Sequence, residues 1–127
     1  MKTTLTILLL FSAVFSISAQ STWKAPSTAK TVDCPLEVSS EDLKEAKKIF
    51  TEMCVICHGN KGKGDGLASA ALTPKPANFS LSTVQSQTDG ELFWKMTNGN
   101  PPMAAYKEIL TETQRWQLVA YIRTFKK

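Results

Sequence analysis

The chain has 127 residues, of which 43% are hydrophobic and 20% charged, a composition typical of one globular domain with a tail rather than two large domains. Fifteen lysines and arginines against eleven aspartates and glutamates give a formal net charge of +4. The sequence contains no dense basic run and no stretch of 18 consecutive apolar residues, so it indicates neither nucleic-acid binding nor a conventional membrane span.

Residues 1–19 have the layout of a secretory signal peptide. Met1 and Lys2 give a short basic start, residues 5–17 are apolar, and Ala19 offers a small residue for cleavage. The alternative is an uncleaved membrane anchor, which the short apolar core disfavours. We therefore expect an exported, for example periplasmic, protein without a membrane span after cleavage and with its cysteines in an oxidising compartment.

The expected domain covers residues 39–127 and follows an extended polar tail over residues 20–38. Ser39 and Asp42 form a capping-box pattern that predicts a helix start. Apolar residues recur behind it at helical spacing, at Leu43, Ala46, Phe50 and Met53. This helix is expected to continue through His58 and to stop at Gly59.

The remaining elements are also helices and loops. Residues 59–87 are rich in glycine and proline and predict a long loop, without the features of a phosphate-binding loop. Capping patterns at Thr88 and Thr111 predict two further helices, the first ending by Asn98-Gly99. Pro101-Pro102 forbids helix between them. No strand pattern appears, so the predicted fold class is all-α.

Residues 54–58 read Cys-Val-Ile-Cys-His, the signature of covalent haem attachment. Residues three and four apart share one face of a helix, so both thiols can reach adjacent haem vinyl groups while the histidine points at the iron. A thioredoxin-type dithiol would need a βαβ setting, a zinc site would need Cys34 as a fourth ligand, and a Cys54–Cys57 disulfide would leave His58 unused.

The second axial ligand is restricted by composition. His58 is the only histidine, which excludes bis-histidine ligation. Methionine is the usual alternative in electron carriers. Met53 and Met96 are expected in the core, whereas Met103 follows two prolines in an irregular segment suited to presenting a ligand. A lysine or the N-terminal amine is a weaker alternative.

The chain resembles a monohaem class I c-type cytochrome over about residues 41–126. The likeness rests on residues 50–59, Gly64-Asp65-Gly66, Met103-Ala104-Ala105-Tyr106 and residues 118–123. It implies a small cytochrome c fold of three to four short helices around one covalently bound haem c. It further implies Cys54 and Cys57 as thioether anchors, His58 as the proximal iron ligand and Met103 as the distal one.

The resemblance also implies packing partners. Ala46 and Phe50 of the first helix should cross Leu118 and Tyr121 of the last. Family members offer a proline carbonyl to the proximal histidine. Pro74 and Pro76 both fit, and Pro76 is preferred because Pro76-Ala77-Asn78-Phe79 resembles the family's Pro-Asn-Leu run. Two departures are Ala46, where a glycine is frequent, and Pro101-Pro102, which replaces a glycine-rich approach to the methionine.

A haem capped on both faces leaves no open position for a substrate, which favours a soluble one-electron carrier over an enzyme. The alternatives are a cytochrome subunit of a larger dehydrogenase or reductase, and a gas-binding or peroxidase-like protein with an open distal site. The expected partners are redox proteins, and an acidic docking surface would suit Lys61, Lys63 and Lys75. Cys34 is left over, as a free thiol, an intermolecular bridge or a small apolar residue that packs the tail down.

Overall fold

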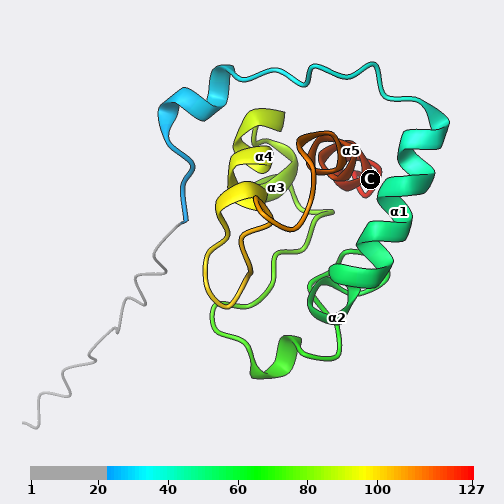
Figure 1. Ribbon diagram of the computed structural model, residues 1–127. Helices are drawn as coiled ribbons and strands as arrows, with labels where there is room; N and C mark the ends of the chain where they lie inside the picture. The colour runs from blue at the N-terminus through cyan, green and yellow to red at the C-terminus, as the bar shows by residue number, and fades with distance from the viewer. Residues whose placement is uncertain (1–22) are drawn as a thin grey trace, which may run out of the picture.

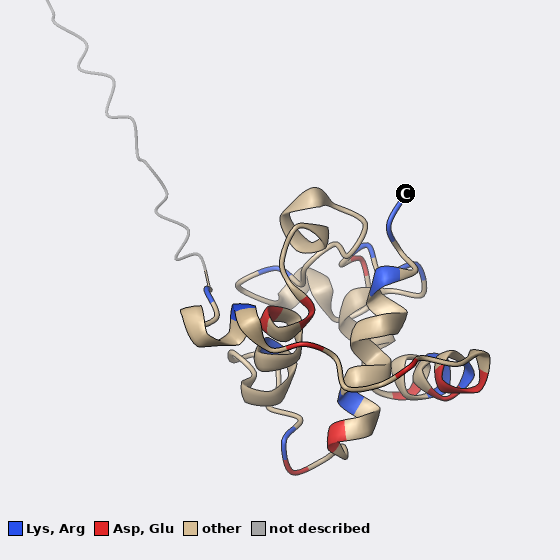
Figure 2. Ribbon diagram, turned by 90° about the horizontal axis from the view of Figure 1, so that it is seen from above, with Lys and Arg blue, Asp and Glu red and all other residues tan. Residues whose placement is uncertain are grey.

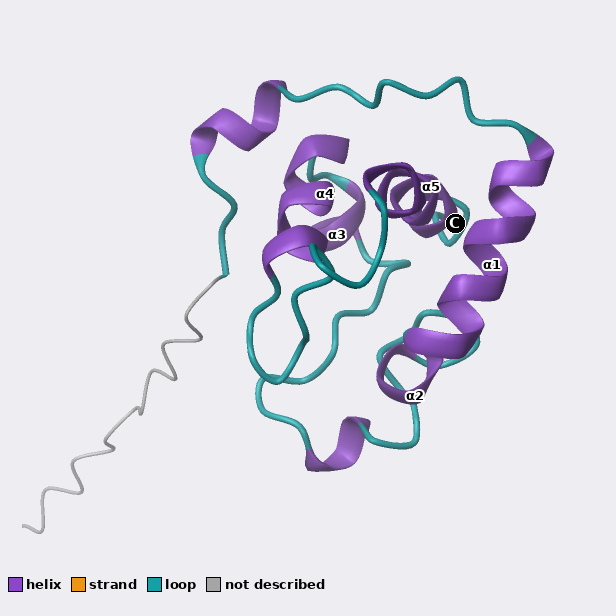
Figure 3. Cartoon of the chain, in the orientation of Figure 1, coloured by secondary structure: helices purple, strands orange, loops and turns teal. Residues whose placement is uncertain are grey.

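The protein was analysed as a computed structural model, which describes residues 23–127 and is drawn in Figure 1. The expected signal peptide, residues 1–19, lies outside the described residues. The regular elements of residues 23–127 are η1 (Ser27–Thr31), α1 (Ser40–Met53), α2 (Val55–His58), η2 (Ser69–Ala71), α3 (Ser82–Gln85), α4 (Asp89–Asn98) and α5 (Glu112–Arg123). All are helical, and Figure 3 shows only helices and loops in this part of the chain, which confirms the all-α class. None of these helices is long and apolar enough to cross a bilayer.

Capping boxes begin the three long helices where the sequence predicts them. The side chains of Ser39, Thr88 and Thr111 each accept a hydrogen bond from the backbone N–H three residues on, at the starts of α1, α4 and α5. The side chain of that third residue accepts one from the cap's own N–H in return. Each box satisfies two N–H groups that the first helical turn leaves unpaired, so the helix start is fixed locally.

The core lies where α1 crosses α5. Ala46 is fully buried on α1, and Leu118 is 1% exposed on α5. One turn along each helix, the rings of Phe50 and Tyr121 are 5.3 Å apart between centroids. The expected crossing of these two helices is therefore confirmed, and the small side chain of Ala46 lies within it. Figure 1 shows α1 on one side of the molecule, with α3, α4 and α5 grouped across from it.

Residues 23–39 form a strap that runs from α4 to the start of α1, visible at the top of Figure 1. Most of the strap is extended, but it includes the 3₁₀ helix η1, which packs on α4. The contact is close because a Cβ at Gly90 would overlap the carbonyl oxygen of Ala29. Only glycine fits this approach of one backbone to another.

Two short helices were not predicted in the long loop between residues 59 and 87. They are η2 and α3, of three and four residues, too short to produce a periodic apolar pattern. The first predicted helix also differs slightly, because α1 ends at Met53 and α2 begins at Val55. Cys54 lies between them with φ −110° and ψ −31°, still in the right-handed helical region, so the chain bends there without leaving its helical path.

Candidate haem site

The predicted attachment motif forms α2 and the residue before it. Cys54, Cys57 and His58 are all partly buried, and each cysteine is a free thiol. The loop that follows returns to this helix. The N–H of Gly66 donates to the carbonyl of Cys57 at 3.1 Å, and the N–H of Gly64 donates to the carbonyl of His58 at 2.8 Å. These bonds satisfy carbonyl groups that the end of a short helix leaves free.

The close approach of the loop to α2 requires a glycine at position 66. A Cβ at that position would overlap the carbonyl oxygens of Val55 and Ile56, so the loop lies directly against the backbone of the attachment helix. The helix is therefore supported along its length by its own following loop, which fixes the direction of the side chains of Cys57 and His58. Gly66 belongs to the Gly64-Asp65-Gly66 run of the family likeness, but its contact with α2 does not follow from the sequence.

The ring of His58 is held by two contacts. Its Nδ1 lies 3.1 Å from the carbonyl oxygen of Ala77. Because a carbonyl can only accept, Nδ1 carries the proton and Nε2 is the nitrogen available to a metal. The ring also stacks on that of Phe79, with centroids 4.4 Å apart and planes inclined by 17°. The preference for Pro76 as the acceptor is wrong by one residue, since the chain turns so that the next carbonyl faces the ring.

Burial changes the protonation of the motif. It lowers the pKa of His58, an effect opposed by the hydrogen bond to Ala77, so the neutral imidazole that binds iron is favoured. It raises the pKa of the Cys54 thiol to about 11, with a smaller contribution from Cys57. Burial also raises the pKa of Tyr106, and the two cysteines add to that shift, which places this phenol beside both thiols.

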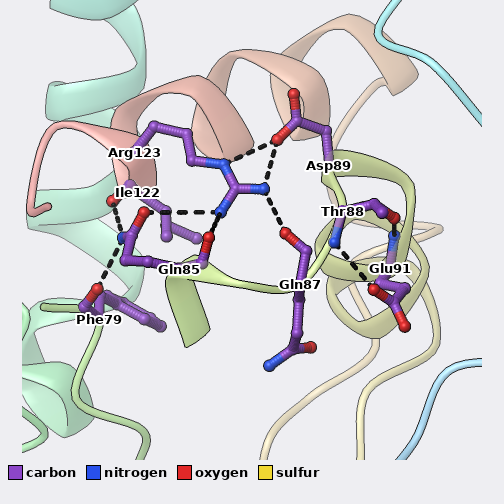
Figure 4. Close-up of polar contacts among 8 residues, drawn as sticks. All are labelled: Phe79, Gln85, Gln87, Thr88, Asp89, Glu91, Ile122 and Arg123. Carbon is purple, nitrogen blue, oxygen red and sulfur yellow. Dashed lines mark hydrogen bonds and ion pairs between the residues drawn. The ribbon is translucent and has the colours of Figure 1, made fainter. Parts of the chain in front are cut away.

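The backbone of Phe79 is held by the network of polar contacts in Figure 4. The side-chain amide of Gln85 donates to the carbonyl of Phe79 at 2.6 Å and to that of Ile122 at 3.0 Å. Arg123 donates to the backbone carbonyls of Gln85 and Gln87. Its guanidinium also pairs with Asp89 at 2.6 Å. The end of α5 is thereby connected through α3 to the aromatic ring that supports His58.

Met103 lies on a tight turn between α4 and α5. Asn100 and Met103 exchange both backbone hydrogen bonds, at 3.1 and 2.8 Å, across Pro101-Pro102. The segment is anchored to α4 because the N–H of Tyr106 donates to the carbonyl of Met96 at 3.1 Å. The Tyr106 hydroxyl lies 3.4 Å from the carbonyl of Met53, the residue just before the attachment motif. Tyr106, three residues after Met103, therefore joins this segment to the end of α1, next to Cys54.

The other methionines differ from each other. Met96 is 6% exposed and belongs to the core, as expected. Met53 is 38% exposed, so the expectation that it lies in the core is wrong. Its place at the end of α1 turns it away from the α1–α5 crossing, while its backbone carbonyl faces Tyr106. Of the three methionines that the structure describes, Met103 alone is presented by an irregular turn.

Two further sequence expectations concern Lys75 and Cys34. The ammonium of Lys75 donates to the carbonyls of Ser69 and Ala70 at 3.0 and 2.8 Å, so this side chain fastens η2 and is not free like a docking residue. Cys34 is partly buried, packs against the core, and its thiol lies 3.8 Å from the carbonyl of Leu36. This location favours its interpretation as an apolar residue that packs the strap down.

The residues present fit a covalently bound haem. Two free thiols one turn apart precede an imidazole whose Nδ1 is already occupied, leaving Nε2 for iron. Metal-binding histidines typically engage their second nitrogen in this way. The competing zinc interpretation gains no support, because residues 23–127 bring together no cluster of three or more His, Cys, Asp or Glu side chains. Cys54 and Cys57 also remain unbridged.

The family model described as "Cytochrome C oxidase, cbb3-type, subunit III" matches residues 41–122. The chain belongs to this family of c-type cytochrome domains. The match begins in α1 and ends in α5, so it includes both the attachment motif and the Met103 segment. A c-type cytochrome carries its haem covalently, and its cofactor is therefore haem c. Such domains transfer electrons.

Solved structures share the fold. A chain of the Kuenenia stuttgartiensis reducing HAO-like protein complex Kustc0457/Kustc0458 is similar with a TM-score of 0.64 and 24% identity, over 76% of this chain and 50% of that one. The c-type cytochrome KustC0563 is similar with a TM-score of 0.56 and 27% identity, over 65% of this chain and 98% of that one. A point mutant of the same cytochrome is similar with a TM-score of 0.55 and 28% identity, over 65% of this chain and 99% of that one. This cytochrome thus spans half of the first chain and nearly all of the other two. No curated protein sequence matches it significantly.

Proposed function

We propose that this cytochrome is an exported one-electron carrier with haem held by Cys54 and Cys57 and with iron ligated by His58 and Met103. The observation that carries the proposal is the state of His58, whose Nδ1 is bound to Ala77 and whose ring is stacked on Phe79, next to two free thiols. When bound, the haem supplies a one-electron ferric/ferrous couple, and a methionine ligand raises its potential.

The chain's own residues limit the site to electron transfer. Ala77 and Phe79 fix the proximal imidazole, so its orientation needs little adjustment. The hydrogen-bonded turn of Asn100 and Met103 presents the thioether sulfur. With iron held by His58 and Met103, no ligand position would stay open for a substrate, and no bond of a metabolite would be broken. Export follows from the signal-peptide layout of residues 1–19.

A second candidate is a cytochrome subunit of a larger redox assembly. It is favoured by the similarity to one chain of the reducing HAO-like protein complex. This cytochrome spans half the length of that chain. Electron transfer at the haem would be the same in both cases. Sedimentation of the protein purified from its native cells separates them: a species of monomer mass supports the free carrier, and a stable larger complex supports the subunit.

The experiment that tests the site compares two methionines. The ferric wild type should be low-spin with the weak long-wavelength band of a sulfur–iron bond, and the ferrous form should bind carbon monoxide slowly or not at all. Met103→Ala should erase the band, lower the reduction potential and open the iron to carbon monoxide. Met96→Leu, a volume-conserving change in the core, should do none of these. A high-spin wild type that binds carbon monoxide rapidly would contradict the electron-carrier proposal.

A further inference from the structure

A hollow lies between the strap and α4, away from the haem-attachment motif. Its volume is about 250 Å³, and it opens to solvent. Figure 1 shows η1 across the molecule from α2, so this hollow is separate from the candidate haem site. We call it the strap groove. Its lining residues are Thr28, Ala29, Val32, Phe93, Trp94 and Thr97.

The walls of the strap groove are mostly apolar, and none of its six lining residues is charged. Phe93 and Trp94 supply aromatic surfaces from α4, while Ala29 and Val32 supply the apolar surface of the strap. An apolar cavity of about 150 Å³ is large enough to hold a benzene molecule. The strap groove therefore has room for one aromatic ring that carries a small polar group. A ligand of this size touches the strap and α4 at the same time.

A buried arginine lies beside this groove. The chain has two arginines, both on α5. Figure 2 shows basic segments near both ends of the helix that leads to the C-terminus. Arg123 pairs with Asp89. Arg115 is only 7% exposed, yet it has no carboxylate partner among residues 23–127. Because buried charges in proteins are normally paired, the isolated guanidinium of Arg115 indicates a place for an anion.

Two lining residues of the strap groove contact the Arg115 guanidinium. Its central carbon lies 5.0 Å from the centroid of the Phe93 ring, and its Nη1 donates to the hydroxyl of Thr97 at 3.0 Å. Its Nε is buried and has no hydrogen-bond partner in the described part of the chain. The Thr97 hydroxyl accepts the bond from Arg115, so its own proton stays available to a ligand. The side chains of α4 and α5 thus place a positive charge and a hydroxyl donor at the edge of an apolar groove.

We propose that the strap groove binds a small aromatic carboxylate, with its ring between the strap and α4 and its carboxylate on Thr97 and Arg115. A carboxylate supplies the negative charge that Arg115 lacks, and its two oxygens match the planar guanidinium. A neutral ring leaves the guanidinium unpaired, and a small anion leaves the apolar walls uncovered. The site is distinct from the haem and adds a binding function to electron transfer. A bound ligand also fastens the strap to α4.

The test titrates the haem-loaded ferrous protein, labelled with nitrogen-15, with sodium benzoate as the probe. In proton–nitrogen correlation spectra, the backbone amides of Ala29 and Thr97 and the indole N–H of Trp94 should shift and saturate. The expected Kd lies in the millimolar range, as for other ligands of so few atoms. Acetate has the charge without the ring, and benzyl alcohol has the ring without the charge, so each should bind about tenfold more weakly or less. Shifts that do not saturate, or that lie outside the strap groove, would overturn the proposal.

Three variants test the polar end of the site. Arg115→Gln removes the guanidinium and should weaken benzoate binding about tenfold or more. The matched control Lys48→Gln removes the same charge from an exposed position on α1 and should change the Kd less than about twofold. Thr97→Val keeps the shape of the side chain without its hydroxyl and should weaken binding severalfold. If Arg115→Gln does not fold, Thr97→Val and the comparison with benzyl alcohol decide. Equal Kd values for benzoate and benzyl alcohol, or for wild type and the folded groove variants, would overturn the carboxylate site.

The strap gives an independent readout. The N–H of Ala29 donates to the carbonyl of Pro26 at 2.9 Å, and the N–H of Val32 donates to the carbonyl of Ala29 at 3.3 Å. Hydrogen exchange at both amides should slow in benzoate-saturated protein, because a bound ligand holds η1 on α4. Unchanged exchange would contradict the placement of the ligand between the strap and α4. None of these measurements depends on the haem potential, so their failure would leave the proposed electron-transfer function intact.

Discussion

Replacing Phe79 should both destabilise the protein and disturb its haem. The ring is 9% exposed and has three aromatic neighbours: His58 at 4.4 Å, Phe125 at 6.1 Å and Phe50 at 6.2 Å between centroids. Truncating a buried phenylalanine to alanine costs about 3–5 kcal/mol. Phe79→Leu keeps most of the apolar volume but loses the ring pairs, each worth about 0.5–1.5 kcal/mol, so we expect a loss of about 2 kcal/mol.

This loss should appear in guanidinium unfolding of the haem-loaded protein, followed by far-ultraviolet circular dichroism. For a domain of this size it corresponds to a fall in Tm of about 10 °C. The second readout is the haem. Without its stacking partner, the His58 ring keeps one contact, to Ala77, so the reduction potential and the imidazole proton resonances should shift in Phe79→Leu.

Phe93→Leu is the matched control. Phe93 stacks on Trp116 with centroids 4.0 Å apart and an interplanar angle of 12°, a comparable geometry without contact to His58. It should destabilise the protein to a similar extent but leave the potential and the imidazole resonances unchanged. If both variants affect the haem equally, or if Phe79→Ala costs less than about 1 kcal/mol, the reasoning about Phe79 is refuted.

Three further results are expected. Gly66→Ala should cost about 1–3 kcal/mol in urea unfolding, because its Cβ must push the loop off the backbone of α2, and an unchanged midpoint would contradict that contact. Hydrogen bonds from Ser39 and then Gln117 lower the pKa of Asp42 below its ordinary value of 3.8. The ionised Asp42 carboxylate therefore stabilises the folded protein fully above pH 3.8, and this contribution is lost as the pH falls through the lower pKa of the native state. Asp42→Asn should therefore melt below wild type at pH 7, with the gap closing in acid. Cys34 should react slowly with thiol reagents in the native protein, and non-reducing gels should show a monomer; a dimer band would support the intermolecular bridge.

The sequence was most informative where local chemistry decides the structure. The capping residues Ser39, Thr88 and Thr111 each bond to a neighbour three positions on, so the starts of the long helices can be predicted without knowing the rest of the fold. The motif at residues 54–58 is equally local. The family match confirms the cytochrome interpretation and, with it, the haem c cofactor. The ligand roles of His58 and Met103 stay predictions.

The errors concern contacts between distant segments. The acceptor for His58 is the carbonyl of Ala77 and not of Pro76, which depends on the path of a loop 19 residues away. Lys75 resembles any other loop lysine until the loop folds its ammonium onto η2. The exposure of Met53 depends on which side of α1 meets α5. None of these follows from spacing along the chain, because each is decided by how separate elements meet.

The crossing of α1 and α5 joins the two ends of the domain, and this has a consequence for the order of events during synthesis. Ala46 is made early, but its buried position exists only once Leu118 has been made, 72 residues later. Contacts of such long sequence range form late and slowly. Until the two ends meet, the Cys54 and Cys57 thiols belong to an open chain. The topology therefore leaves both thiols accessible until the last helix has packed on the first.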